Sequence, residues 1–109
     1  MVDLRRFPRV PLQASLEFSL SAETSSRRRG KARDISVGGM FIEADDPPSV
    51  VGQGLTVFLT LPSRPEMALP AVVRWSDGAG MGVQFGLLGA RETHEITELA
   101  SAHRRGSSG

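Results

Sequence analysis

Residues 31–42 read KARDISVGGMFI, and this stretch joins two segments that favour β-structure through a short polar turn. The turn at residues 34–39 is too polar and too rich in glycine to belong to a hydrophobic core. Asp34 and Ser36 can bond to the backbone two residues further on, which fixes such turns. The two glycines at its exit allow a positive φ or the close approach of another molecule. We therefore expect this turn to form one half of a binding site.

Apolar and polar residues alternate in four segments of the chain, at 10–20, 55–61, 69–75 and 81–85, a pattern typical of strands with one buried face. The longest of these segments runs from Val10 to Leu20, and Pro11 near its start favours a sheet edge or a strand entry. The expected strands are residues 10–20, 27–33, 40–44, 55–61, 69–75 and 81–85. Turn residues separate these segments, and this spacing predicts a small β-sandwich or β-barrel.

The periodicity becomes helical near the C-terminus, where Ile96, Leu99 and His103 recur at helical spacing. We expect a short amphipathic helix there that covers an open end of the strands. The length of 109 residues fits one domain. The predicted organisation is a mobile N-terminal arginine arm at 1–9, a β-domain with its C-terminal helix at 10–103 and a flexible tail at 104–109.

The charges are unevenly distributed along the chain, although the formal net charge is only +1. Residues 1–33 carry eight Lys or Arg against three Asp or Glu, and the remaining residues carry five against nine. A basic first part suggests an anionic partner. Solvated loops would account for the same charges, so composition alone leaves both interpretations open.

Cysteine is absent, which excludes disulfides and thiolate metal sites. No apolar run approaches the length of a membrane span, and the N-terminal residues lack the apolar stretch of a signal peptide. We expect a cytoplasmic protein that does not contact a membrane.

Little in the sequence supports catalysis. The two histidines, His94 and His103, lie in or near the predicted helix, where histidines are usually surface or packing residues. Ser36 has Asp34 close by but no neighbouring histidine to act as its base. The sequence also lacks a His/Asp/Glu cluster with metal-ligand spacing and a phosphate-binding Gly-Lys-Ser/Thr run. We therefore expect neither an enzyme nor a cofactor or metal site.

Binding is better supported, because Arg5, Arg6 and Arg9 place three guanidinium groups within five residues. Guanidinium groups bond to phosphate, and to the O6/N7 edge of guanine, in pairs. On an extended arm Arg5 and Arg9 lie up to roughly 13 Å apart, a span that suits a ligand with both phosphate and base. The Asp34 carboxylate can accept from N1–H and N2–H of guanine, and Ser36 can donate to a phosphate or to O6.

Arg5-x-x-x-Arg9 followed by Asp34-x-Ser36-x-x-Gly39 resembles the paired signature of PilZ domains, which are receptors for the bacterial second messenger cyclic di-GMP. The resemblance covers nearly the whole chain. The stretches that carry it, in the order of the family, are RFPRV at 6–10, DISVGGMFI at 34–42, VRW at 73–75 and GMGVQF at 80–85.

This resemblance implies an all-β fold with one helix, namely a six-stranded antiparallel β-barrel with a C-terminal α-helix. It also implies that the arm wraps over the ligand, that its arginines take phosphates and guanine edges, and that the turn contacts a guanine. The implied ligand-binding residues are Arg5, Arg6, Arg9, Asp34, Ser36, Gly39 and Trp75.

Each of these positions also has a purely structural interpretation. Asp34 and Ser36 would cap their own turn, and Gly39 would serve only the backbone geometry. Trp75 continues an apolar alternation and on that pattern alone would be a core residue. The basic run Arg27–Arg29 would be a solvated face.

The leading hypothesis is a cyclic di-GMP receptor without catalysis, which presents a changed surface to an unidentified downstream protein in motility, pilus, biofilm or related regulation. The alternative is a PilZ-like protein-interaction module that does not use the nucleotide. A general nucleic-acid binder would fit a small barrel, but the aromatic residues are few, with one Trp, five Phe and no Tyr. We therefore expect no nucleic-acid polymer as a partner.

Overall fold

The structure is a computed structural model that describes residues 9–21, 26–45, 47, 50–61 and 65–107. Arg5 and Arg6 of the predicted arm lie outside the described residues. The elements are β1 (Val10–Leu20), β2 (Arg28–Ile35), β3 (Gly39–Glu43), β4 (Gly54–Leu59), β5 (Met67–Ser76), β6 (Gly80–Phe85) and α1 (Ala90–Ser107).

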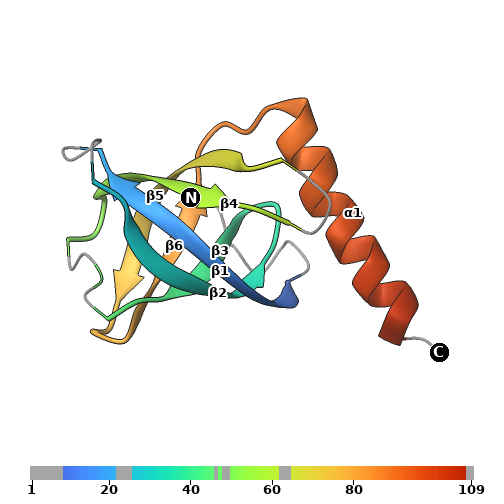
Figure 1. Ribbon diagram of the computed structural model, residues 1–109, viewed down its shortest axis with the longest axis horizontal. Helices are drawn as coiled ribbons and strands as arrows, with labels where there is room; N and C mark the ends of the chain where they lie inside the picture. Colours follow the sequence, from blue (N-terminus) through green and yellow to red (C-terminus); the bar gives the residue numbers. More distant parts are fainter. Residues whose placement is uncertain (1–8, 22–25, 46, 48–49, 62–64, 108–109) are drawn as a thin grey trace.

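The six strands form one closed barrel in the order β1-β2-β3-β6-β5-β4, and every neighbouring pair is antiparallel. Because the sheet closes on itself, each strand has a neighbour on both sides. Figure 1 shows α1 beside one end of the barrel, with its C-terminal half running away from the strands. The predicted six-stranded antiparallel barrel with a C-terminal helix is confirmed.

The core lies inside the barrel, on the face that the alternation predicted. In β4, the buried residues Leu55, Val57 and Leu59 alternate with partly exposed neighbours. Phe18 of β1 is enclosed in the same core, and α1 adds Ile96 to it, each with 1% of its surface exposed. The helix is therefore attached to the barrel through its apolar face.

The turn after β2 is shorter than the sequence indicated. Asp34 is still part of β2, and Gly39 is already part of β3, so that only residues 36–38 lie outside the strands. Asp34 is therefore held by strand pairing on both sides, to β1 and to β3. A carboxylate fixed in this way has a better defined position than one on a free loop.

The helix is longer than the sequence indicated. It continues to Ser107, so residues 104–107, which we expected to belong to a flexible tail, are helical. Arginine is a good helix former, and the two arginines at 104–105 favour this continuation. Within the part of the chain that the structure describes, no helix combines the length and the apolar character needed to cross a membrane.

Candidate functional site

Five residues from five strands lie in one continuous line across the outside of the barrel. Pro11 is the partner of Asp34, and Asp34 is the partner of Phe41. Phe41 is the partner of Gly82, and Gly82 is the partner of Trp75. We call this line the outer row. Strand pairing thus brings together residues that lie far apart in the sequence, among them the predicted site residues Asp34 and Trp75.

Trp75 lies on the surface because of an irregularity in β5. The register shifts between Val73 and Trp75, so that one extra residue, Arg74, is inserted opposite β6. A β-bulge of this kind changes the face to which the following side chains point. Trp75 is 46% exposed, whereas Val73 is fully buried. The alternation, which on its own indicated a core position for Trp75, is interrupted by this bulge.

The indole of Trp75 packs along the outer row. Its ring is stacked on that of Phe41, with 5.2 Å between the ring centroids and 22° between the planes. Gly82 lies beneath the indole, since a Cβ at this position would overlap with Nε1 of Trp75. Two aromatic rings and a glycine therefore form a flat, partly exposed surface next to Asp34.

A second bulge re-aims the side chains of β2. Ala32 is the partner of Ile42 and Asp34 is the partner of Phe41, which leaves Arg33 as the extra residue. Ala32 is fully buried, while Arg33 is exposed and Asp34 is half-buried. Two consecutive charged side chains thus lie on the outside of the barrel, where strict alternation would have allowed one.

Asp34 joins the end of the predicted arm to the outer row. Arg9 donates from Nη1 to Oδ1 of Asp34 at 2.6 Å, and the backbone N–H of Phe41 donates to the same oxygen at 3.1 Å. About a third of each charged side chain is exposed, 30% for Arg9 and 32% for Asp34. The structure therefore brings together one residue from each of the two signatures that the sequence suggested.

A shallow hollow of about 530 Å³ surrounds this ion pair. Its walls come from the start of β1, from β2 and from β3, and include Arg9, Pro11, Gln13, Arg33, Asp34 and Phe41. Gln13, Arg33 and Phe41 are not among the site residues predicted from the sequence. Gln13 and Arg33 belong to neither signature, and Phe41 lies within an apolar run that is typical of a buried strand.

Ser36 lies inside its own turn rather than in the hollow. Its side chain is buried, and its hydroxyl oxygen accepts from the backbone N–H of Gly38 at 3.1 Å and of Gly39 at 3.3 Å. The same hydroxyl donates to the carbonyl oxygen of Gly39 at 3.4 Å. In this structure Ser36 fixes the turn that follows Asp34.

Gly39 is required by the close approach of two strands. A Cβ on this residue would overlap with the carbonyl oxygen of Val83 in β6. Its φ is not positive; among the described glycines only Gly52 and Gly78 have a positive φ. The absence of a side chain here lets β3 pair closely with β6.

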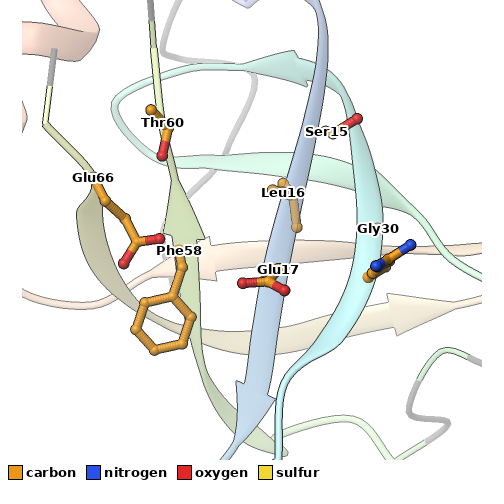
Figure 2. Close-up of a pocket in the computed structure, with 8 residues that line it drawn as sticks. Ser15, Leu16, Glu17, Gly30, Phe58, Thr60 and Glu66 are labelled. Atoms are coloured by element: carbon orange, nitrogen blue, oxygen red, sulfur yellow. The ribbon is translucent and has the colours of Figure 1, made fainter.

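A second hollow, of about 320 Å³, lies further along β1 and extends to β4 (Figure 2). Beside it, Arg27 Nη1 pairs with Glu17 Oε1 at 3.2 Å and with Glu66 Oε2 at 3.3 Å. The guanidinium carbon of Arg27 also lies 3.6 Å from the centre of the Phe58 ring. The hydrogen bond to Glu17 raises the pKa of Arg27 above its ordinary value. Arg27 is therefore a structural residue on the surface, with partners that the sequence did not reveal.

Among the described residues, no three or more His, Cys, Asp or Glu side chains gather into a group that could hold a metal ion.

A family model described as PilZ domain matches residues 3–101. The chain belongs to the PilZ domain family. This match includes both signatures and all six strands. In this PilZ domain the outer row, the ion pair of Arg9 with Asp34 and the hollow around it lie within the matched part of the chain.

Solved structures of other PilZ proteins have the same fold. The PilZ domain of CeSA from a cellulose-synthesizing bacterium is 17% identical with a TM-score of 0.71, covering 87% of this chain and 96% of that one. The PilZ domain of YcgR from Escherichia coli, solved with c-di-GMP, is 15% identical with a TM-score of 0.75, covering 96% and 95%.

The Bacillus subtilis inhibitor of motility MotI/DgrA is 17% identical to the chain, with a TM-score of 0.77. That match covers 96% of the present chain but only 53% of MotI/DgrA, so the PilZ domain described here spans about half of that protein. A search of curated proteins gave no match.

Proposed function

We propose that this PilZ domain is a receptor for cyclic di-GMP and binds it in the hollow formed by the start of β1, by β2 and by β3. The observation that carries the proposal is the 2.6 Å ion pair between Arg9 and Asp34, which joins the two halves of the paired signature. The PilZ domain of YcgR, which has the same fold, was solved with c-di-GMP.

The hollow offers the chemical groups that this ligand requires. The Asp34 carboxylate accepts from N1–H and N2–H of a guanine, and the Arg9 guanidinium donates to a phosphate. Among the described residues, Arg9 and Phe41 both bond to Oδ1 of Asp34, and none bonds to its Oδ2. Arg5 and Arg6 would add further cations for the two phosphates and for guanine edges.

Binding would then be an exchange of partners for Arg9. Before binding, its guanidinium neutralises Asp34; in the complex it moves to a phosphate, and Asp34 takes the guanine. An ion pair at such an exposed position contributes only about 0–1 kcal/mol, so the exchange costs little. The surface around Arg9 and Asp34 changes with the exchange, and an unidentified downstream protein would recognise that change. Regulation of motility is one such output, by likeness to the inhibitor MotI/DgrA.

Isothermal titration with cyclic di-GMP, beside GTP and a short oligonucleotide, tests this proposal. Four or five charged hydrogen bonds, less the ordering of several residues, predict a Kd of roughly 1 µM. An Arg5→Ala, Arg9→Ala double variant should bind at least about a hundredfold more weakly, because it loses several of these bonds. Unchanged binding by the double variant would refute the proposed role of the arginines, and preference for the oligonucleotide would refute the proposed ligand.

One observation favours a second candidate, a PilZ-like protein-interaction module that does not use the nucleotide. The Ser36 hydroxyl and Oδ1 of Asp34 already have partners within the chain, so the second signature also has a complete structural role. For this module, cyclic di-GMP should produce no heat of binding in the titration, even with all signature residues intact.

A further inference from the structure

The bulge in β2 places Arg33 beside Asp34 on the same wall of the hollow. Both side chains line it, and they are consecutive in the sequence, so their Cα atoms lie about 3.8 Å apart. On a regular strand the two would point to opposite faces. The bulge therefore places a guanidinium group and a carboxylate group next to each other at the edge of one ligand-sized space.

The guanidinium group of Arg33 is held in place through one of its three nitrogens, Nε. Its Nε pairs with Oε1 of Glu43 in β3 at 3.1 Å, and its side chain is 55% exposed. An arginine has five N–H donors, of which four are on the two Nη nitrogens. In the described part of the chain, no partner engages those two nitrogens. Glu43 thus orients the group and leaves a pair of donors for a ligand.

Guanine presents two adjacent edges that match this pair of side chains. Its N1–H and N2–H groups donate to a carboxylate, and its O6 and N7 atoms accept from a guanidinium group in a paired arrangement. Adenine, with N7 as an acceptor and N6–H₂ as a donor, offers no second acceptor to an arginine at that edge. A neighbouring carboxylate and guanidinium group would select guanine over adenine.

We propose that Arg33 is a specificity residue of this site, which donates to O6 and N7 of the guanine whose N1–H and N2–H edge is bound by Asp34. This inference rests on the proposed binding of cyclic di-GMP and adds a residue outside both signatures. Arg33 acts together with Glu43, which fixes the orientation of its side chain.

Titrations of four proteins with two ligands test this role. The proteins are the wild type, Arg33→Ala, Arg33→Lys and the control Arg29→Ala, which removes the same charge from the outer face of β2 but does not line this hollow. The ligands are cyclic di-GMP and its analogue with 7-deazaguanine in both bases, in which a carbon replaces the N7 acceptor. Circular dichroism verifies that each variant is folded.

We expect Arg33→Ala to weaken the binding of cyclic di-GMP by roughly ten- to a hundredfold, and Arg33→Lys to weaken it as well, because lysine lacks the rigid planar fork of donors that Glu43 orients in Arg33. Arg29→Ala should remain within about twofold of the wild type, since exposed charges contribute little. The deaza analogue should bind the wild type about tenfold more weakly than cyclic di-GMP, yet bind Arg33→Ala as well as cyclic di-GMP does.

Three results would overturn the assignment. Wild-type affinity in Arg33→Ala would show that Arg33 makes no contact with the ligand. Full rescue by lysine would show that the planar fork of donors is not required, and a deaza penalty that persists in Arg33→Ala would place N7 beside another residue. If the wild type does not bind cyclic di-GMP at all, the proposed function fails, and this inference fails with it.

Discussion

Gly39 and Ser36 stabilise the turn from which the outer row continues into β3. Gly39 lets β3 approach the backbone of β6, and the hydroxyl of Ser36 bonds to the two amide groups that follow it. Neither contribution involves a ligand. Asp34 is different, since its carboxylate is partly exposed and pairs with Arg9 across 25 residues of sequence. Within one short motif, two residues therefore build the turn and one faces the hollow.

We expect Gly39→Ala to lower the free energy of unfolding by about 3 kcal/mol, the upper end of the range for overpacking. The new Cβ would meet a backbone carbonyl oxygen, which cannot move aside as a flexible side chain would. Chemical denaturation measures the effect. Gly86→Ala is the control, because a Cβ there would lie 3.7 Å from its nearest neighbour, Pro70, at ordinary contact distance. Equal stability of the two variants would contradict the inferred close approach.

At the scale of secondary-structure elements, the bulges in β2 and β5 shape the site. Each inserts one residue and re-aims its neighbours: Arg33 and Asp34 both come to the hollow, and Trp75 turns outward over Gly82. Bulges are frequent next to functional sites for this reason. The strands supply the frame, and their irregularities decide which side chains face the hollow.

We expect Gly82→Ala to displace the indole of Trp75 and to break its stacking on Phe41, because the added methyl group would overlap with the indole ring. Trp75 is the only tryptophan, so the intrinsic fluorescence reports this residue alone. The emission should shift to longer wavelength and become easier to quench with iodide, with a loss of about 1 kcal/mol of stability. An unchanged spectrum would contradict the stacked arrangement.

The strands could be predicted from the sequence, and the bulges could not. Alternation of apolar residues located four of the six strands, since burial on one face of a strand repeats every two residues, and the polar turn at 34–39 located the two strands beside it. One inserted residue reverses that pattern, and nothing in the local composition marks it, so the alternation alone indicated a core position for Trp75 and only the family resemblance implied a surface position. The pairing of Arg9 with Asp34 was expected only as two halves of one site, because the direct contact depends on strand register.

On the scale of the whole molecule, α1 belongs to the barrel and is not an appendage. Ile96 is enclosed in the core that all six strands form, although the C-terminal half of the helix runs away from the strands. Closure of the barrel and attachment of the helix are therefore parts of one packing unit.

We expect Ile96→Ala to lower the free energy of unfolding by about 2–5 kcal/mol, because it removes a buried branched side chain and leaves a cavity. Leu87→Ala is the matched control: Leu87 is 96% exposed, so its truncation should change stability by less than about 0.5 kcal/mol. Thermal and chemical unfolding of the two variants give the comparison. Similar stabilities would show that the helix is not part of the cooperative unit.

The outer row also constrains which substitutions can occur during evolution of this domain. Its members come from five strands. A larger residue at position 82 requires a smaller one at position 75, because the indole of Trp75 occupies the space above Gly82. Asp34 and Arg9 are linked in a similar way, because the guanidinium group of Arg9 donates a hydrogen bond to the carboxylate of Asp34. Within descendants of this chain, substitutions at these positions should accumulate in compensating pairs. Correlated substitutions would then link positions that lie far apart in the sequence and would not be confined to one motif.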